Sequence, residues 1–271
     1  MTNLEIKSNS KKEKINIYNL TDFKYMRKAG NLAAETLDFI TKYVKPGVTT
    51  EKLDELCHNF ILDNNATPAP LNYNGFPKSI CTSVNHVVCH GIPSKKVLDK
   101  GDIINVDVTV ILDGWYGDTS RMFIVGENTS IKAKKLIQVT YDSMMEGIKI
   151  IKPGLSLGEL GYTIEKIAKK NSFTIVKDFC GHGIGRNFHE APSVLHYGIK
   201  GQGLELKEGM IFTIEPMLNA GTEEVKVLSD GWTAVTKDKK LSAQFEHTIG
   251  VTKTGYEIFT LSPKKYHKPP Y

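Results

Sequence analysis

Hydrophobic and small residues recur every three or four positions in two long stretches of the chain, which is the spacing of one buried helix face. They are Met26, Ala29, Ala33, Leu37 and Ile40 in the first stretch, and Leu136, Thr140, Met144 and Ile148 in the second. A shorter helical pattern follows each stretch, formed by Leu53, Leu56, Cys57 and Phe60 and then by Leu160, Ile164 and Ile167. The pattern predicts two pairs of amphipathic helices.

The turns inside these two helix pairs have nearly the same sequence. Residues 44–49 and residues 151–156 both hold Lys-Pro-Gly between a branched apolar residue and a hydroxyl residue, and they lie 107 positions apart. We expect Thr49 and Ser156 to cap the helices that follow, and Ser156 to form a capping box with Glu159. The shared turn and helix pattern indicates an internal duplication.

The apolar residues 103–111 predict a β-strand that turns back at the Asp-Gly dipeptide of residues 113–114, because this dipeptide favours a tight hairpin. In that register Thr109 pairs with Asp118, and Asp107 lies two residues along on the same face. Two carboxylates side by side in a half-buried hairpin repel each other unless a cation lies between them. The alternative, a turn acid and an exposed strand acid, fits the apolar neighbours less well. The hairpin therefore predicts part of a metal site.

The strand motifs of the first half also recur in the second. Aligning Gly101 with Gly209 places Asp107 on Glu215, and the His-Gly pairs that begin at His90 and His182 correspond in the same order. Two α-β-β halves, at about residues 22–125 and 130–252, are therefore expected to be related by pseudo-two-fold symmetry. We predict an α+β fold with one curved antiparallel sheet, helices on its outer face, and a polar site built from both halves on its inner face.

Composition narrows the class of protein further. The chain has 271 residues, 40% hydrophobic content and a net charge of +5, and its lysines are scattered, which argues against nucleic-acid binding as the main role. The cysteines lack a C-x-x-C spacing and no apolar run approaches the roughly 18 residues of a membrane span. Residues 1–16 are polar and are expected to form a disordered tail, and residues 263–271 a C-terminal tail. We expect a cytoplasmic protein.

Five residues on predicted strands can supply a dinuclear metal centre. They are Asp107, Asp118, His182, Glu215 and Glu246. Four carboxylates and one imidazole suit Mn, Fe, Co or Zn, and two divalent ions about 3.5–4 Å apart would balance four negative charges. Taken singly, each could be a surface or strand-end group. Flanking glycines favour His182 as a ligand, whereas Glu246 is predicted only through the set.

Seven motifs between about residue 17 and residue 261 resemble those of type I methionine aminopeptidases. They are Cys89-His90-Gly91-Ile92-Pro93, Asn105-Val106-Asp107-Val108-Thr109, Gly117-Asp118-Thr119-Ser120, Gly181-His182-Gly183-Ile184-Gly185, Phe188-His189-Glu190, Thr213-Ile214-Glu215-Pro216-Met217 and Gln244-Phe245-Glu246-His247-Thr248. The resemblance implies a pita-bread fold for residues 17–262. It also implies removal of the N-terminal methionine from nascent polypeptides whose second residue is small.

The resemblance assigns a position to each predicted metal ligand. Asp107 would chelate one ion, Asp118 and Glu246 would bridge both ions, and His182 with Glu215 would hold the other. A water activated by the metals would be the nucleophile.

Catalytic and pocket residues follow from the same resemblance. Glu215 would accept a proton, His189 would bind the peptide carbonyl as it becomes an oxyanion, and His90 would contact the substrate backbone and assist proton transfer. The residues expected to surround the methionine side chain are Tyr73, Phe76, Cys81, Phe188 and Trp232. Ordinary core packing is the alternative for these aromatic residues.

Two positions depart from the family pattern. Type I enzymes often have a cysteine where Pro70 stands and a histidine where Asn74 stands, so details of the pocket are open. The resemblance further implies a monovalent cation, Na or K, at Asn85, Val87 and Ser242.

Other members of the same fold offer competing functions. Xaa-Pro peptidases usually carry a large domain before the repeat, and type II methionine aminopeptidases carry a long insertion, whereas 30 residues separate Glu215 from Glu246 here. Non-catalytic binding proteins of this fold have typically lost metal ligands. We therefore expect a monomeric enzyme that acts on the N-terminus of nascent polypeptides. The ribosome is a candidate partner, and neither DNA nor a membrane is expected to be one.

Overall fold

The computed structural model describes residues 14–271, so residues 1–13 of the predicted N-terminal tail lie outside the described part. Two further residues of that predicted tail contact the domain. Ile15 packs against the hydrophobic core of the second half, and the Asn16 side chain donates a hydrogen bond to Glu190. The segment that packs against the folded domain therefore begins at least two residues before Ile17, the predicted start of the domain.

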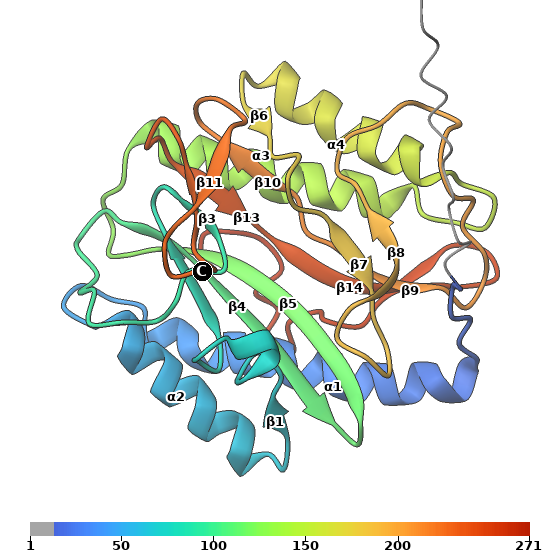
Figure 1. Cartoon of the computed structure of the whole chain (residues 1–271), viewed down its shortest axis with the longest axis horizontal. Coiled ribbons are helices and arrows are strands. Elements are labelled where there is room, and N and C mark those ends of the chain that lie inside the picture. Colours follow the sequence, from blue (N-terminus) through green and yellow to red (C-terminus); the bar gives the residue numbers. More distant parts are fainter. Residues whose placement is uncertain (1–13) are drawn as a thin grey trace, which may run out of the picture.

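Two helix pairs form as the apolar spacing predicts (Figure 1). The helices are α1 (Leu20–Ile40), α2 (Thr50–Asp63), α3 (Ile131–Lys149) and α4 (Leu157–Lys170), with short 3₁₀ helices η1 (Thr41–Tyr43) and η2 (Tyr73–Gly75). The predicted apolar positions of α1 and α3 are all buried. Asn19 begins α1 with a capping box that includes Asp22, because each side chain accepts from the other residue's backbone N–H.

The two Lys-Pro-Gly turns are built alike. Gly47 and Gly154 have φ of 86° and 87°, a region that favours glycine, and they donate to the carbonyls of Leu98 and Leu206, at 2.9 Å each. The predicted capping box at Ser156 is wrong: its side chain makes no capping hydrogen bond, and its hydroxyl is buried without a partner among the described residues.

The central sheet has nine strands in the order β1-β4-β5-β14-β9-β7-β8, with β2 paired to β4 and β15 paired to β14. Its strands are β1 (Thr67–Pro68), β2 (Cys81–Val84), β4 (Ile103–Leu112), β5 (Trp115–Ile124), β7 (Gly181–Gly183), β8 (Glu190–Val194), β9 (Ile211–Ile214), β14 (Glu246–Val251) and β15 (Tyr256–Ile258). All of its pairings are antiparallel. The predicted α+β architecture is confirmed.

Two three-stranded sheets accompany the single sheet that we predict. One contains β6 (Thr174–Ile175), β10 (Met217–Asn219) and β13 (Ser242–Gln244), and the other contains β3 (Val87–Cys89), β11 (Val225–Val227) and β12 (Ala234–Thr236). They bring residues from distant parts of the chain, including Gln244 and Trp232, to the cavity described below.

The β4–β5 hairpin has the predicted register. Thr109 pairs with Asp118 and Leu112 with Trp115, and the two turn residues between them have φ of 52° and 73°. These positive φ values explain the Asp-Gly dipeptide, since asparagine, aspartate and glycine tolerate this conformation. The pairing sets Asp118 and, two residues along the other strand, Asp107 on one face.

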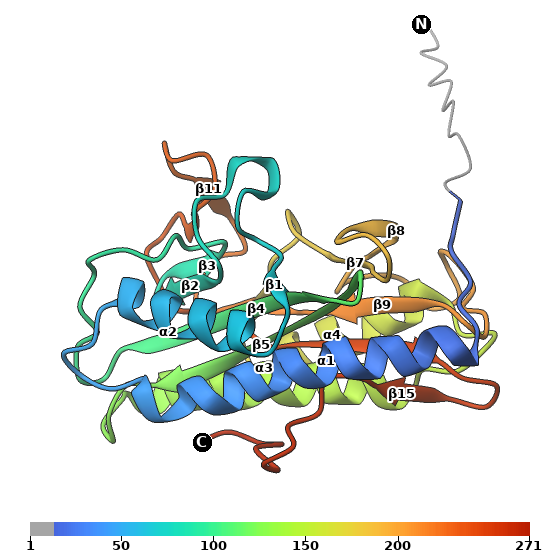
Figure 2. The ribbon, with the colours of Figure 1, turned by 90° about the horizontal axis from the view of Figure 1, so that it is seen from below.

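The two halves join where β5 pairs with β14, with Ser120 opposite Glu246. Figure 2 shows α1 and α3 along one face of the sheet, with β3 and β11 of a smaller sheet on the opposite side. One core cluster lies between α1, α2 and the β4–β5 hairpin, and a second lies between α3, α4 and the strands of the second half. In β5, a side chain at Gly117 would meet the Ala29 backbone at 2.3 Å, so glycine lets α1 lie directly on the sheet. The helices thus cover one face and leave the other for the site.

Residues 263–271, the predicted C-terminal tail, contain no helix or strand and pack against the helical face. Arg121 anchors this segment: its guanidinium forms an ion pair with Asp38 at 2.9 Å and lies 4.7 Å from the centre of the Tyr271 ring. The Ser262 hydroxyl donates to the same Asp38 carboxylate. Among the described residues, no helix has both the length and the apolar character needed to cross a bilayer.

Candidate metal centre

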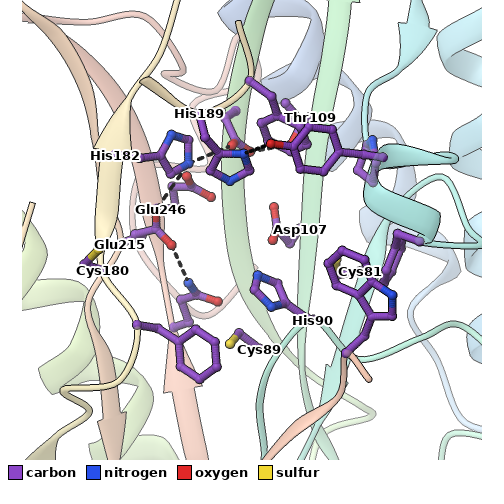
Figure 3. Close-up of a pocket in the computed structure, with 18 of the residues that line it drawn as sticks. Cys81, Cys89, His90, Asp107, Thr109, Cys180, His182, His189, Glu215 and Glu246 are labelled. Atoms are coloured by element: carbon purple, nitrogen blue, oxygen red, sulfur yellow. Dashed lines mark hydrogen bonds and ion pairs between the residues drawn. The ribbon is translucent and has the colours of Figure 1, made fainter. Parts of the chain in front are cut away.

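All five predicted metal ligands line one cavity of about 610 Å³ on the open face of the sheet. Asp107 comes from β4, Asp118 from β5, His182 from β7 and Glu246 from β14, while Glu215 directly follows β9. Figure 3 shows the labelled members of this group around a common space, with Asp107 facing His182, Glu215 and Glu246. The structure therefore brings together residues that are up to 139 positions apart in the sequence, as the repeat predicts.

Asp118 and Glu246 form the buried floor of the cavity, with 3% and 2% of their surfaces exposed. Thr109 donates its hydroxyl proton to Asp118 Oδ1 at 2.7 Å. Thr119 and Thr248 donate across the β5–β14 junction to the backbone carbonyls of Glu246 and Asp118, each at 2.7 Å. The first hydroxyl orients the Asp118 carboxylate, and the other two hold together the strands that carry both acids.

His182 presents one ring nitrogen to the carboxylates. Its Nδ1 donates to the carbonyl of Gly183 at 3.0 Å, so Nε2 is the nitrogen that faces the carboxylates and that can bind a metal once it has lost its proton. Nε2 lies 3.6 Å from both Asp118 Oδ2 and Glu215 Oε1. Two ligand atoms of a tetrahedral ion with bonds of about 2.1 Å are about 3.4 Å apart, so this spacing suits a shared cation.

Glu215 is held by three contacts that the sequence does not predict. Thr213 donates to its Oε1 at 2.7 Å, and Gln244 donates to its Oε2 at 3.2 Å. The Glu215 backbone N–H donates to Nε2 of the buried His196 at 3.0 Å. Thr213 and Gln244 lie in two of the motifs quoted above, but the spacing of residues does not show that their side chains point toward Glu215. His196 lies in none of these motifs, so the sequence gives no reason to connect it with the site.

Burial and mutual repulsion disfavour the charged carboxylates. Burial, with repulsion from neighbouring acids, raises the pKa of Asp107 and of Glu246 well above the usual range, and burial raises the pKa of Glu215 to about 7. Burial opposes a charge on His182, yet its hydrogen bond to Asp118 and the charge of Glu215 outweigh that effect and raise its pKa. A positive charge in the cavity would therefore stabilise the ionised carboxylates.

The donor set fits divalent cations. Ligand atoms of Asp118, His182 and Glu246 all lie within 4.8 Å of one another, and Asp107 and Glu215 line the same cavity. Carboxylate oxygens with one imidazole nitrogen suit borderline and hard divalent metals, and bound cations would relieve the repulsion among the acids. The site is therefore chemically suited to the metal centre that the sequence predicts.

Both predicted catalytic histidines outside the ligand set lie at this cavity. His189 Nδ1 is 2.9 Å from the Tyr73 hydroxyl, and its ring centre is 4.2 Å from that of His182. Burial, with repulsion from His182, lowers the pKa of His189 to about 4, and burial also lowers the pKa of His90. Both imidazoles are therefore neutral at pH 7, and each can donate one hydrogen bond and accept another.

The predicted methionine pocket also lies at the cavity. Its lining includes Tyr73, Phe76, Cys81, Phe188 and Trp232, all of which we predict from the sequence. Phe179 and Met217 also line it and are not predicted. Pro70 and Asn74, the two departures from the family pattern, also line the cavity.

The three residues predicted to hold a monovalent cation lie in two neighbouring segments. The Asn85 carbonyl accepts from the Ser242 backbone N–H at 2.8 Å, and Val87 pairs with Val235 of β12. The structure thus places Asn85 beside Ser242. The cation itself stays a prediction.

Known proteins resemble this chain over nearly its whole length. The sequence profile of metallopeptidase family M24 matches residues 24–253. A methionine aminopeptidase of Rickettsia prowazekii is 66% identical over 259 residues, which cover 95% of this chain and 99% of that protein. The methionine aminopeptidase of Escherichia coli K12 is 52% identical over 249 residues, which cover 91% and 94%.

Solved structures agree with the sequence relatives. The crystal structure of methionine aminopeptidase from Rickettsia prowazekii is 65% identical, with a TM-score of 0.90, and covers 92% of this chain and 100% of that one. The enzyme from Thermotoga maritima is 40% identical with a TM-score of 0.89, covering 91% and 99%. A Bacillus anthracis Xaa-Pro dipeptidase, 23% identical with a TM-score of 0.73 over 91% of this chain and 62% of that one, shares the fold. The predicted resemblance is confirmed, and the chain belongs to metallopeptidase family M24, among the methionine aminopeptidases.

Proposed function

We propose that this chain hydrolyses the first peptide bond of nascent polypeptides that begin with methionine and have a small second residue. The observation that carries the proposal is the meeting of five ligand side chains with an apolar pocket in one cavity. A cavity of about 610 Å³ has room for a methionine side chain and a short stretch of peptide. Membership of a metallopeptidase family supports the use of divalent metal.

Asp107, Asp118, His182, Glu215 and Glu246 would together hold two divalent ions. When bound, such ions supply Lewis acidity that polarises the scissile carbonyl and lowers the pKa of an attacking water. Co, Mn, Fe and Zn all suit this donor set, and a monovalent cation, Na or K, at Asn85, Val87 and Ser242 is a further proposal.

Glu215 would accept the proton of the attacking water. Thr213 and Gln244 fix the orientation of its carboxylate, as proton transfer at a defined place requires. His189 would stabilise the oxyanion: if its Nδ1 accepts from the Tyr73 hydroxyl, its Nε2 carries a proton to donate to the peptide carbonyl. His90 would contact the substrate backbone and assist the proton's transfer to the leaving amine.

The pocket explains a preference for methionine. The rings of Phe76 and Trp232 meet edge to face with centres 5.2 Å apart, and those of Tyr73 and Phe188 are 4.8 Å apart. A flexible thioether packs well against aromatic rings, and the Cys81 thiol adds a small polarisable surface.

A peptide assay tests this function. Metal-loaded protein should release free methionine from Met-Ala-Ser and not from Met-Leu-Ser, and Glu215→Gln should abolish the release. Turnover that survives Glu215→Gln would contradict the mechanism. Release of the first residue from an Ala-Pro peptide instead would favour the Xaa-Pro peptidase alternative, and no turnover in any metal would favour a binding role.

All predicted ligands and pocket residues come from one chain, which supports a monomer as the active unit. A protein that acts on nascent chains would work in the cytoplasm, with the ribosome as a candidate partner. Light scattering at the assay concentration should give about 30 kDa, close to the 30.2 kDa of the chain. A dimer would contradict the proposal.

A further inference from the structure

The Glu190 carboxylate gathers hydrogen bonds from two separate parts of the chain. Asn16 donates to its Oε2 at 2.7 Å, and the Tyr18 hydroxyl lies 2.8 and 3.0 Å from its two oxygens. Asn187 donates to Oε1 from both its backbone and its side chain, each at 3.0 Å. Glu190, the first residue of β8, therefore links the segment before α1 to residues 184–189, the loop between β7 and β8.

The fold makes a specific place for Tyr18. A side chain at Gly185 would meet the Tyr18 hydroxyl at 2.2 Å, and one at Gly209 would meet the Tyr18 carbonyl at 2.5 Å. The Tyr18 N–H donates to the Gly209 carbonyl at 2.8 Å, and its ring meets the Trp115 ring edge to face at 5.5 Å. Two glycines and a tryptophan thus pack closely around Tyr18.

The loop that this network holds carries a catalytic side chain. Phe188 and His189 lie between the Asn187 contacts and Glu190, and the Tyr18 hydroxyl also accepts from the Arg186 backbone N–H at 3.3 Å. Glu190 pairs with Gly183, next to the ligand His182. On the cavity side, His189 has the Tyr73 hydroxyl as its hydrogen-bond partner. Asn16 and Tyr18, which hold the loop, are not among the residues that line the cavity. Glu190 lines the cavity, but its carboxylate accepts from Asn16, Tyr18 and Asn187.

We propose that Tyr18 and Glu190 form a clamp that positions His189 for the reaction. The two are positioning residues, because they act through the loop and not on the substrate. This inference rests on the proposed peptidase function, and it adds a role for the segment before α1 that the family resemblance does not assign.

The hydrogen bond between Tyr18 and Glu190 should persist throughout the neutral pH range. Burial and the hydrogen bond to Glu190 raise the pKa of Tyr18 to about 12, so its hydroxyl remains a donor throughout the neutral range. Hydrogen bonds to a carboxylate are stronger than neutral ones, and several donors share this one. Glutamine in place of Glu190 would turn an NH₂ group toward donors, and phenylalanine in place of Tyr18 would remove the hydroxyl while keeping the ring against Trp115.

Three variants of the full chain test the clamp. Tyr18→Phe and Glu190→Gln should each lower kcat for Met-Ala-Ser roughly tenfold, since small misplacement of a catalytic group slows a reaction by one to two orders of magnitude. Tyr25→Phe is the matched control, because Tyr25 stacks on the same Trp115 ring, 5.7 Å from it, and takes no part in the Glu190 network. It should keep the kcat of the wild type, and all three should keep its Mn²⁺ affinity.

A double-mutant comparison separates positioning from a general structural effect. In a His189→Ala background, Tyr18→Phe should change kcat less than twofold, because the group that the clamp positions is gone. An equal, tenfold loss in both backgrounds would overturn the proposal, as would wild-type kcat in Tyr18→Phe.

Hydrogen exchange tests the clamp without catalysis. Amides of residues 184–191 should exchange faster in Tyr18→Phe and Glu190→Gln than in the wild type and in Tyr25→Phe. Unchanged exchange would overturn the clamp even if the wild type is an active peptidase. A wild type without activity would contradict the proposed function, and the exchange rates would still decide whether the loop is clamped.

Discussion

Replacing Thr109 with valine removes one hydroxyl at the edge of the metal centre and keeps the shape of the side chain. Thr109 is 2% exposed, and its hydroxyl donates to Asp118 Oδ1 at 2.7 Å. Asp118 belongs to the buried group of ligands with His182 and Glu246. The substitution therefore changes how one shared carboxylate is oriented and solvated, and leaves every ligand in place.

The size of the effect follows from the charge and burial of this hydrogen bond. A buried hydrogen bond to a charged group contributes about 1.5–3 kcal/mol, and loss of such a partner to a metal ligand typically lowers metal affinity about 10–100-fold. The substitution removes this hydrogen bond from the metal-free protein as well as from the metal-bound one. Part of its energetic cost is therefore the same in both forms and does not change the metal affinity. We therefore expect the lower end, a loss of roughly tenfold, or about 1.4 kcal/mol of metal-binding free energy.

Calorimetric titration of chelated protein with Mn²⁺ measures this affinity. Thr140→Val is the matched control, because Thr140 is also fully buried and donates to the Leu136 carbonyl within α3, away from the cavity. The control should bind Mn²⁺ as the wild type does. If Thr109→Val also keeps its affinity within twofold, the claim that this hydroxyl orients a metal ligand is refuted.

Three further predictions concern stability. Arg121→Met should cost about 3–5 kcal/mol of unfolding free energy in urea, because it leaves the Asp38 carboxylate buried without its ion-pair partner; an unchanged urea midpoint would contradict this. In chelated protein the folded pKa of Glu215, about 7, exceeds its ordinary value of 4.5, so the folded state keeps a proton that the unfolded state releases. Its stability should fall as pH rises from about 4.5 to above 7, by up to about 1.4 kcal/mol per pH unit, and Mn²⁺ should remove this loss; equal melting curves of chelated and loaded protein at pH 7.5 would oppose it. Gly117→Ala should cost about 1–3 kcal/mol, because the new methyl group would meet the Ala29 backbone, and thermal melting at the wild-type temperature would argue against that contact.

Local patterns in the sequence predict much of this fold. The register of the β4–β5 hairpin depends on two turn residues and a period of two, so the Thr109–Asp118 pair could be predicted without any distant contact. The repeat then places Glu215 opposite Asp107 through symmetry. The hairpin register and the repeat can each be recognised from short sequence motifs. For this reason the sequence alone could predict that Asp107, Asp118 and Glu215 lie close together.

Contacts between distant segments could not be predicted in the same way. Ser156 occupies the N-cap position of α4, but its hydroxyl makes no capping bond, whereas the equivalent Thr49 caps α2. His196 accepts from the Glu215 backbone, and Tyr18 reaches Glu190 across 172 positions. Such pairs depend on how the two halves and their loops pack, and neither periodicity nor spacing carries that information.

The central claim is that five side chains from both halves form a two-metal centre. Anomalous diffraction at several metal edges, on crystals of protein purified without added metal and then soaked in Mn²⁺, tests it directly. We predict two peaks in the cavity, both in contact with Asp118 and Glu246, one also bound by Asp107 and the other by His182 and Glu215. Peaks away from these five residues, or no peak at them, would contradict the account.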